Sequence, residues 1–582
     1  MNANKFFEIV SCDINRNPTE EITTIYKNKN IYYGNKKSFT KKQIKEGIIL
    51  FWDQGSLIVS PYFSEKNKLC NFCFFNQREK AQSFKETMPF IETLDSTVIP
   101  IECLMNAINT IIHAPIERKL FSFYVINELT MKRNFFFRGT YCESCLKNKT
   151  PHIKAIIKNE NERLNKIEVS SKDIRSENKN LIYLLEYPNN DSEFYVKKEL
   201  LESKTISYEL SFVRQSREAA LSGIGTASTY RLAKKKAIFE SLERFSGTAS
   251  LNSKSIINTM EELKKLKKNF YNPNDWFDKT NKKKRISEHE EIYWIESYNP
   301  VKRTNYLIPE DFVIYKNNRK SQANKLVCSS SNGHAIGNTI IEASIYSMYE
   351  LIERDTFLQA WYLRESPLLV IKASIKNSEL QNKIRKIEEN GYDLFIYDLS
   401  SDYYIPTFWV YVEGKNYNKF ASYSTAATHY DNKTALESAL NELDLALSYY
   451  DGHLPEIRKK SEEMKPEDIV TVADHPIYYA SDRSKKYFSF LSKVETKNFS
   501  ENQEEKINLN HHYTELVSRL SKRFNNIYIT RNTPIGVEEL GLEEVKIFIP
   551  GMHDMYFGYD NQIVNLERLG RETDELYIHP FP

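Results

Sequence analysis

Two segments that combine a helical apolar pattern with closely spaced glutamates constrain the fold of this chain more than any other feature. In the first, residues 222–247, a run of small residues precedes a predicted helix. Glu240 and Glu243 lie three residues apart and therefore share one face of that helix, with Arg244 beside them. The apolar stripe of the helix is formed by Ala237, Ile238, Leu242 and Phe245.

The second segment, residues 331–361, carries the same E-x-x-E-R pattern. We predict a loop over residues 333–337 that leads into a helix, because Gly and Asn are concentrated there. Glu342 and Glu353 are eleven residues apart, which at about 100° per residue brings them to within about 20° of one direction. Glu350 lies about 60° from Glu353 on the same side. The apolar stripe of this helix is formed by Ile341, Ile345, Met348 and Ile352.

Each predicted helix presents its acidic group, next to Arg244 or Arg354, on the face away from the apolar stripe. One such helix alone would be explained by an ordinary solvated face. Two such helices in one chain favour a fold in which their acidic groups come together. Carboxylates that come together repel one another unless cations neutralise them. Hard divalent ions such as Mg²⁺, with phosphate oxygens, suit such a site, and a neighbouring Arg can hold phosphate. The pattern predicts nucleotide phosphates bound through carboxylate-held magnesium, without a P-loop or kinase motif.

Four of the seven cysteines form two C-x-x-C pairs that are far apart in the sequence. Each pair places two sulfurs on one tight turn, which suits half of a tetrahedral zinc site. Unrelated thiols and a redox dithiol are the alternatives. We predict a structural zinc ion rather than a catalytic one, because four thiolates leave no open coordination position. Its ligands would be Cys70, Cys73, Cys142 and Cys145.

The composition predicts a soluble cytoplasmic protein, and the mixture of helical and strand patterns predicts a mixed α+β fold (α/β or α+β). The 582 residues include 81 basic and 78 acidic side chains, and this balance argues against a general nucleic-acid binder. No apolar run reaches the ~20 residues of a membrane helix, and the N-terminus lacks a signal-peptide core. We expect a small zinc-bearing domain over residues 1–155 and a catalytic domain over residues 156–582. The expected strands are 47–52, 57–60, 121–125, 393–397 and 407–412, and a helix is expected over 101–112.

The chain ends in ELYIHPFP, without a polar tail after Pro582. Pro580 and Pro582 each fix one backbone dihedral and favour an extended conformation. Such a strip is either packed into the protein or a docking tag, and it can thread a channel at low entropic cost.

The motifs A-x-x-E-x-x-E-R-F-S, S-N-G-x-A-x-G-N-T-x-x-E-A followed by E-x-x-E-R-D, and the terminal HPFP together resemble the YcaO family. They resemble most its azoline-forming branch, the ATP-dependent cyclodehydratases of thiazole/oxazole-modified peptide biosynthesis. The resemblance covers roughly residues 200–582 and includes HYDNKTALESALNEL, Asp474-His475 and IPGMHDMYFG. The segments LIVSPYFSEKNKLCNFC and YCESC resemble a truncated ThiF-like, ubiquitin-activating-type fragment carrying zinc.

The resemblance implies a bacteriocin-type or other natural-product synthetase. A Cys, Ser or Thr side chain of a ribosomal precursor peptide attacks the preceding backbone carbonyl, ATP phosphorylates the resulting oxygen, and loss of phosphate gives a thiazoline or oxazoline. It also implies the magnesium ligands Glu240, Glu243, Glu350 and Glu353, and contacts to phosphate or metal from Asn338, Glu342 and Arg354. The carboxylate of Pro582 would act as proton acceptor or organiser in catalysis.

Five positions depart from the family pattern: Ile224, Lys236, Ala335, Lys546 and Ile578. Since the predicted magnesium glutamates are all present, we expect an active enzyme. A thioamide- or amidine-forming YcaO enzyme and a non-catalytic docking scaffold are the alternatives. Because the N-terminal part is short, we expect a separate ThiF-like partner protein to recognise the leader of the precursor peptide. An FMN-dependent azoline dehydrogenase is a further expected partner, and we expect a homodimer or a hetero-complex.

Overall fold

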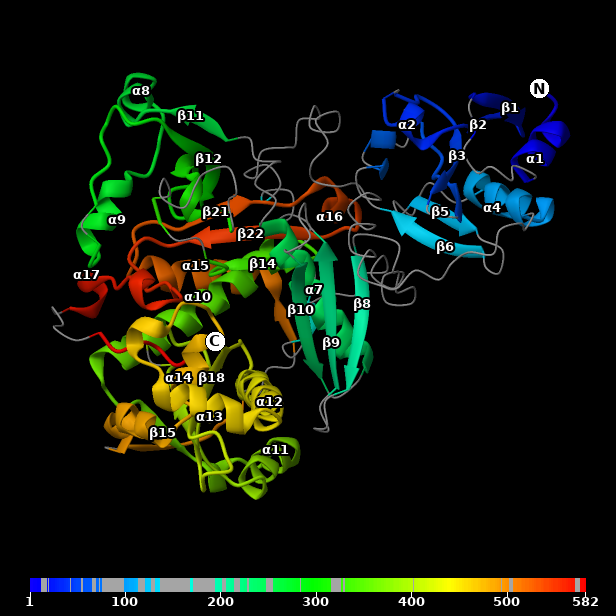
Figure 1. Cartoon of the computed structure of the whole chain (residues 1–582). Helices are drawn as coiled ribbons and strands as arrows, with labels where there is room; N and C mark the ends of the chain where they lie inside the picture. Colours follow the sequence, from blue (N-terminus) through cyan, green and yellow to red (C-terminus); the bar gives the residue numbers. More distant parts are fainter. Residues whose placement is uncertain are drawn as a thin grey trace.

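The computed structural model covers the chain from end to end and describes most of it (Figure 1). The described residues are 1–581 apart from 12–17, 19, 42, 54–55, 65–69, 73, 76–98, 114–120, 127–130, 137–156, 158–167, 171–193, 201–205, 214–219, 228–229, 248–254, 283, 316–325, 328–329, 401, 493–494, 502–505 and 571–575. The predicted domain boundary near residue 155 therefore falls outside the described residues. None of the helices in these ranges is both long enough and apolar enough to span a bilayer.

The N-terminal part is a six-stranded sheet in the order β1-β2-β3-β4-β5-β6, in which only β2 and β3 are parallel. Apolar side chains alternate between its two faces, as the two-residue period of a strand requires. Ile48 and Leu50 pack under helices α1 and α4, while Ile49 and Phe51 join a cluster rich in Phe on the other face. The elements are α1 (Ala3–Ser11), β1 (Ile22–Tyr26), β2 (Lys29–Tyr33), α2 (Lys36–Phe39), β3 (Ile48–Asp53), β4 (Ser56–Val59), α4 (Ile101–His113), β5 (Phe121–Ile126) and β6 (Met131–Phe136).

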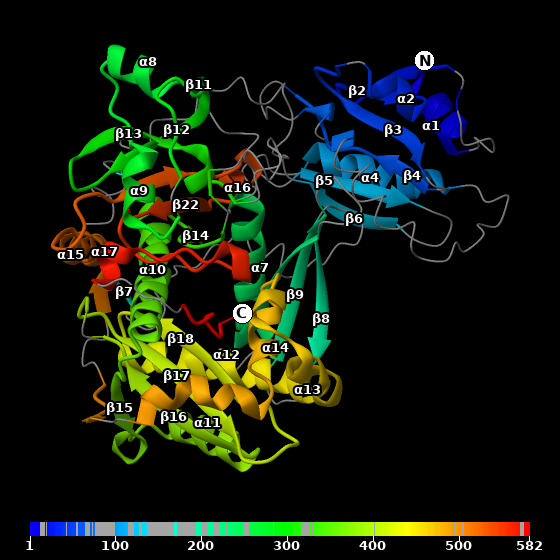
Figure 2. The ribbon, with the colours of Figure 1, turned by 60° about the vertical axis from the view of Figure 1, so that its left-hand side comes forward.

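A three-stranded antiparallel sheet lies between the N-terminal sheet and the rest of the molecule (Figures 1 and 2). It consists of β8 (Phe194–Leu200), β9 (Ile206–Val213) and β10 (Ala220–Ala227), and helix α7 (Tyr230–Gly247) packs on β9 and β10. The helix approaches β10 very closely at two glycines. A Cβ atom on Gly225 would lie 1.9 Å from the Ala233 carbonyl oxygen, and one on Gly223 would lie 2.4 Å from that of Ala237.

Helix α10 (Ile340–Leu363) joins the two remaining sheets, as Figure 2 shows. Its N-terminal half packs on β14 and β22, and its C-terminal half packs against β17 and β18. Thr339 caps the helix, since its hydroxyl accepts a hydrogen bond from the Glu342 amide at 3.0 Å. Most residues of α10 are buried, and the partly exposed ones, which include Glu350, Glu353 and Arg354, lie mainly along one side of the helix.

The upper sheet has the order β11-β12-β21-β22-β14, with β13 paired to β12. Aromatic side chains such as Trp294 and Phe548 fill its core. Its elements are β11 (Ile256–Asn258), α8 (Met260–Lys265), α9 (Pro273–Lys279), β12 (Ile292–Asn299), β13 (Thr304–Pro309), β14 (His334–Gly337), β21 (Tyr528–Arg531), α16 (Ile535–Glu539) and β22 (Glu543–Phe548).

The lower sheet has the order β18-β17-β16-β15-β19, and only β15 and β19 are parallel. Helices α11 and α12 cover one face, and the C-terminal half of α10 with the end of the chain covers the other. Its elements are β15 (Leu368–Ile371), α11 (Ser378–Glu389), β16 (Tyr392–Asp398), β17 (Thr407–Gly414), β18 (Ser422–Thr428), α12 (Asn432–Asp451) and β19 (Thr496–Asn498).

The remaining elements of the C-terminal part surround these two sheets. They are β7 (Glu168–Ser170), α13 (Leu454–Glu463), α14 (Asp474–Tyr478), the 3-10 segment η7 (Asp482–Ser492), β20 (Lys506–Asn508), α15 (Leu509–Ser521) and α17 (Leu566–Leu569).

The strands predicted at 47–52, 57–60, 121–125, 393–397 and 407–412 are confirmed within one or two residues, as are the helices predicted near 101–112 and after Thr339. The loop predicted over residues 333–337 is wrong, because His334–Gly337 form strand β14 and pair with β22. An ordinary solvated face does not explain the second glutamate helix. Glu342 and Asp355 are buried, and Glu350 and Glu353 are partly buried, so none of these carboxyl groups lies on a freely solvated surface.

The close packing of α7 on β10 predicts that Gly225→Ala destabilises the chain. The new methyl group would overlap the backbone of α7, and overpacking of this kind costs about 1–3 kcal/mol. Chemical denaturation measures the loss. Gly452→Ala is the matched control, since the nearest atom to its Cβ would be 3.6 Å away. Equal stability of the two variants would contradict this packing.

Candidate active site

Three strand-helix pairs, β10-α7, β14-α10 and β18-α12, each contribute glutamates to one region of the molecule. On α7, Glu240 is held by two partners. One of its carboxylate oxygens pairs with Arg244 at 2.6 Å, and the other accepts a hydrogen bond from the Ile224 amide of β10 at 2.7 Å. The side chain of Ile224, one of the departures from the family pattern, is about half exposed, and its backbone orients the carboxylate.

Glu350 of α10 repeats this arrangement. One of its oxygens pairs with Arg354 at 2.7 Å, and the other accepts a hydrogen bond from the Gly333 amide at 2.8 Å. In each E-x-x-E-R group, the first Glu therefore binds the Arg one turn later and a backbone amide just before the helix. Gly333 has φ of +66°, which favours glycine at this position.

Glu353 accepts a hydrogen bond from the Thr428 amide at the end of β18, at 3.2 Å. Burial and the negative charge of Glu442 on α12 raise the pKa of Glu353 well above its usual value. Burial and the charge of Glu240 raise the pKa of Glu442 in turn, and Lys236 opposes this rise. Burial raises the pKa of Glu350, and Arg354 opposes that rise. Carboxyl groups from α7, α10 and α12 thus lie near enough to repel one another.

Within the described ranges, no three His, Cys, Asp or Glu side chains stand close enough together to hold a metal ion as they are placed. Here the two carboxylate oxygens of Glu240 and of Glu350 are each engaged by an arginine and a backbone amide. The donor set still fits Mg²⁺, because its atoms are carboxylate oxygens whose repulsion a divalent cation would relieve. Such an ion would displace Arg244 or Arg354 from its carboxylate and free it for phosphate.

Buried cationic groups beside these carboxylates fit phosphate oxygens. The Nη1 atom of Arg354 is buried and has no hydrogen-bond partner among the residues that the structure describes. Lys546 is 5% exposed, and its ammonium group donates to the Asn332 carbonyl. Burial lowers the pKa of Lys546, while Asp554 and Glu350 oppose the change, which places this lysine next to the site.

The other predicted site residues lie at the edges of this cluster. Asn338 donates a hydrogen bond to Glu342 at 3.1 Å, so these two residues form a pair at the start of α10. Burial raises the pKa of Glu544 well above its usual value, and the negative charge of Glu243 adds to the rise. Glu243 therefore lies on the side of α7 that faces β22. Ala335 is buried in β14.

The C-terminal strip packs beside α10. The Phe581 ring stacks on Phe357, with ring centres 3.9 Å apart and an interplanar angle of 19°. Tyr479 donates to the carbonyl of Ile578, and His475 Nδ1 donates to the carbonyl of His579 at 2.8 Å. His475 Nε2 accepts from the Gly558 amide at 3.0 Å, and burial lowers its pKa to about 4. A neutral His475 thus holds the strip, and Pro582 itself lies outside the described residues.

Of the four predicted zinc ligands, the structure describes one. Cys70 is described and partly buried, whereas Cys73, Cys142 and Cys145 lie outside the described residues. The prediction of a zinc site with four cysteine ligands therefore stays a prediction.

Sequence reasoning did not identify Glu442 as a site residue. The segment HYDNKTALESALNEL was noted only as a resemblance, and Glu442 lacks the E-x-x-E-R pattern that marked the other two helices. The sequence offered one signal: the apolar side chains of α12 have helical spacing, and Glu442 stands beside them on the helix. The buried apolar residues of α12 include Ala435, Leu436, Ala439, Leu440 and Leu443.

Comparison with known proteins shows the family. The model of the YcaO cyclodehydratases, described as ATP- and Mg²⁺-binding, matches residues 224–553, more than half of the chain. Among curated proteins none matches the sequence. A solved heterocyclase in complex with substrate and cofactor is 15% identical with a TM-score of 0.64, over 90% of this chain and 75% of that one. The heterocyclase TruD is 16% identical with a TM-score of 0.51, over 89% of this chain and 71% of that one.

The chain therefore belongs to the YcaO family, and it is an ATP-dependent cyclodehydratase. The two solved heterocyclases share its fold.

The raised pKa of Glu442 predicts a pH-dependent stability that magnesium changes. Between about pH 4.3 and about pH 7, the folded chain binds more protons at this carboxyl than the unfolded chain. Stability should therefore fall as pH rises through this window. We expect Glu442→Gln to reduce the fall in Tm over this pH range, because the amide does not titrate. We also expect Mg²⁺ to raise the wild-type Tm more at pH 8 than at pH 5.5, because the carboxyl group is charged at the higher pH.

Thermal unfolding with and without Mg²⁺ measures both effects. Glu437→Gln, on the same helix and paired with Lys383 at 3.7 Å, is the control and should behave as wild type. An identical pH profile in Glu442→Gln and in wild type would contradict the assignment.

Proposed function

We propose that this enzyme converts Cys, Ser or Thr residues of a ribosomal precursor peptide to thiazolines or oxazolines. The observation that carries this proposal is the convergence of carboxylates from three helices beside Arg354 and Lys546. Burial, and after it repulsion by neighbouring glutamates, raises the pKa of both Glu353 and Glu442. A site of this charge and donor type suits a nucleoside triphosphate with its magnesium ions.

The chemistry requires one phosphoryl transfer. The side-chain sulfur or oxygen loses its proton to a base as it attacks the preceding carbonyl carbon, and the resulting oxyanion takes the γ-phosphoryl group of ATP, releasing ADP. The phosphate then leaves with the former carbonyl oxygen, while the amide nitrogen loses its proton and a C=N bond forms. Magnesium, when bound, neutralises charge on the transferring phosphoryl group.

We assign the metal ions to Glu240, Glu243, Glu350 and Glu353, and we add Glu442 to this set. Arg354 would hold phosphate through its buried Nη1 atom, which no described residue engages, and its position on α10 supports this role. Asn338 and Glu342 would contact phosphate or metal from the start of α10. All these assignments rest on position and charge.

A cavity of about 650 Å³ supports a peptide as the acceptor. It opens beside the C-terminal half of α10, where Thr356 and Ala360 line it. Ala360 lies about 20° from the direction of Glu353 and about 10 Å further along the helix, a distance that about three extended residues span. Apolar and polar side chains alternate in its lining, including Leu399, Phe408, Ser400 and Asn432.

The C-terminal strip would bring the carboxylate of Pro582 toward the reacting centre, where it would accept a proton. The stacking of Phe581 on Phe357, one turn after Glu353, supports this placement.

The wider organisation belongs to the same proposal. We propose an N-terminal domain over residues 1–155, stapled by a zinc ion on four cysteines and related to ThiF, and a catalytic domain over residues 156–582. A separate ThiF-like partner would present the leader of the precursor, and an FMN-dependent dehydrogenase would oxidise the azolines. The two C-x-x-C pairs support the zinc ion, and we place the enzyme in the cytoplasm as a homodimer or hetero-complex.

Glu353→Gln should abolish peptide-dependent ATP turnover and leave folding intact, because the amide keeps the shape but loses the charge that a cation needs. Phosphate release with a Cys/Ser/Thr-rich peptide, and mass spectrometry of that peptide, measure the loss. Cyclisation removes the mass of one water per ring, whereas thioamide formation adds mass. Glu437→Gln is the matched control, and full activity of Glu353→Gln would refute the assignment.

Ala360→Phe should fill the cavity and weaken peptide turnover while sparing nucleotide binding. The measurement is the KM for the same peptide together with the Kd for the ATP analogue AMPPNP. Gln381→Phe, on the distant helix α11, is the control. An unchanged peptide KM would place the acceptor elsewhere.

A further inference from the structure

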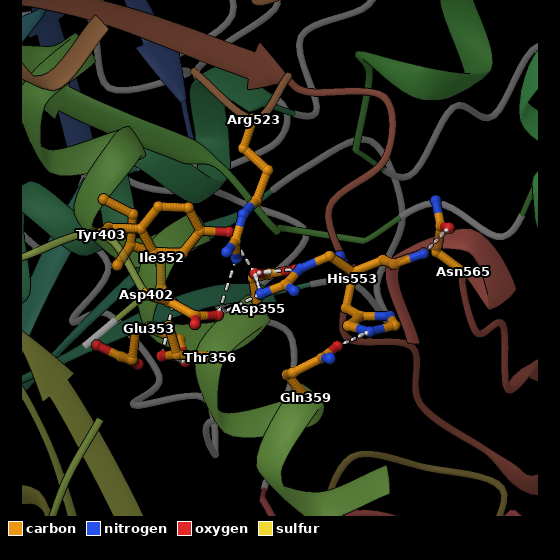
Figure 3. A network of polar contacts seen from close by, with 11 residues as sticks. Ile352, Glu353, Asp355, Thr356, Gln359, Asp402, Tyr403, Arg523, His553 and Asn565 are labelled. Atoms are coloured by element: carbon orange, nitrogen blue, oxygen red, sulfur yellow. Dashed lines mark hydrogen bonds and ion pairs between the residues drawn. The ribbon is translucent and has the colours of Figure 1, made fainter. Parts of the chain in front are cut away.

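Asp355, two residues after Glu353, is the centre of a buried polar network (Figure 3). Its side chain is fully buried, and both carboxylate oxygens have partners. The His553 amide donates to Oδ1 at 2.8 Å, and the Tyr403 hydroxyl donates to Oδ2. Arg568 donates to Oδ2 from Nη2 at 2.8 Å and from Nε at 3.1 Å.

Arg568 is the only cation that pairs with Asp355 among the described residues. Its guanidinium is 9% exposed and bridges to Asp402 in the connection between β16 and β17. Asp402 also pairs with Arg523 at 3.1 Å. In the described part of the chain, the ion pair of Asp355 is with Arg568 and not with Arg523. Asn565 caps α17, accepting from the Arg568 amide at 2.9 Å, and so fixes the base of this side chain.

The network lies on the side of α10 opposite to the glutamates. Asp355 points about 200° away from Glu353, so Arg568 does not face the proposed metal site. It instead fixes the rotation of α10 about its own axis. On another side of the same turn, Phe581 stacks on Phe357, so the C-terminal segment contacts this helix twice.

The network also reaches the cavity. Asp402 and Thr356 both line it, and Gln359 beside them accepts a hydrogen bond from His553 Nε2 at 2.9 Å. One guanidinium therefore connects the helix that carries the metal glutamates to a wall of the proposed peptide cavity.

We propose that Arg568 is a positioning residue, which holds α10 through Asp355 so that Glu350 and Glu353 share the nucleotide-bound magnesium. This inference rests on the proposed function. Magnesium accepts little deviation from octahedral geometry, and a constellation of ligands must be held to within about 0.5 Å. Mutation of a residue that orients metal ligands without binding the metal itself typically weakens metal affinity by about 10–100-fold.

Arg568→Lys keeps the charge but loses the two-pronged contact to Asp355. We expect the full-length variant to fold with a Tm near that of wild type, and to need about tenfold more Mg²⁺ for half-maximal AMPPNP binding. Excess Mg²⁺ should restore binding. Arg523→Lys makes the same chemical change on the outer side of Asp402, and it should need the same Mg²⁺ concentration as wild type.

Isothermal titration of Mg²⁺ into the full-length protein with AMPPNP gives the Mg²⁺ concentration at the midpoint of binding, and thermal unfolding shows whether the variant folds. A merely structural role would lower Tm without shifting the midpoint. Tyr403→Phe removes only one hydroxyl donor to Asp355 and should shift the midpoint less, in the same direction. If Arg568→Lys does not fold, the midpoint of Tyr403→Phe tests the positioning role instead. An unchanged midpoint in a folded variant, with normal wild-type binding, would overturn the positioning role alone. Absence of Mg²⁺-dependent binding in wild type would overturn the proposed function.

Discussion

The arrangement of this enzyme depends on carboxylates placed on a helix that is largely enclosed by the rest of the fold. A buried charge is costly unless a cation or hydrogen-bond donors compensate it. Each acidic residue of α10 has its own compensation, drawn from a different part of the chain. Glu342 has Asn338, Glu350 has Arg354 and the Gly333 amide, Glu353 has the Thr428 amide, and Asp355 has Arg568.

These compensations explain why the two C-terminal sheets and the end of the chain surround α10. The amide before β14 and the amide ending β18 both turn inward to the glutamates, and the segment around α17 approaches from the other side. Compensation is incomplete where the α7, α10 and α12 carboxylates meet. Their repulsion is the feature that a magnesium-bound triphosphate would remove, and it connects the electrostatics of the fold to the family to which the chain belongs.

The sequence predicted the parts of this arrangement that local spacing determines. Three-residue spacing and 100° per residue place Glu240 with Glu243, and Glu350 with Glu353, without knowledge of the fold. The N-terminal strands were also predictable, because their apolar alternation is local. Strand β14 was missed because the residues that flank it, Asn332, Gly333 and Asn338, are typical of a loop, whereas pairing with β22 makes His334–Gly337 a strand. Arg568 and Asp355 are 213 residues apart, so no local pattern could have shown their contact.

The most direct test is a crystal structure of the full chain with AMPPNP and Mn²⁺, in which anomalous scattering locates the metal. The account predicts anomalous peaks between α7, α10 and α12, within ligand distance of Glu353 and Glu442, with the triphosphate in contact with Arg354. Nucleotide bound elsewhere, with these carboxylates still paired as they are now, would contradict it.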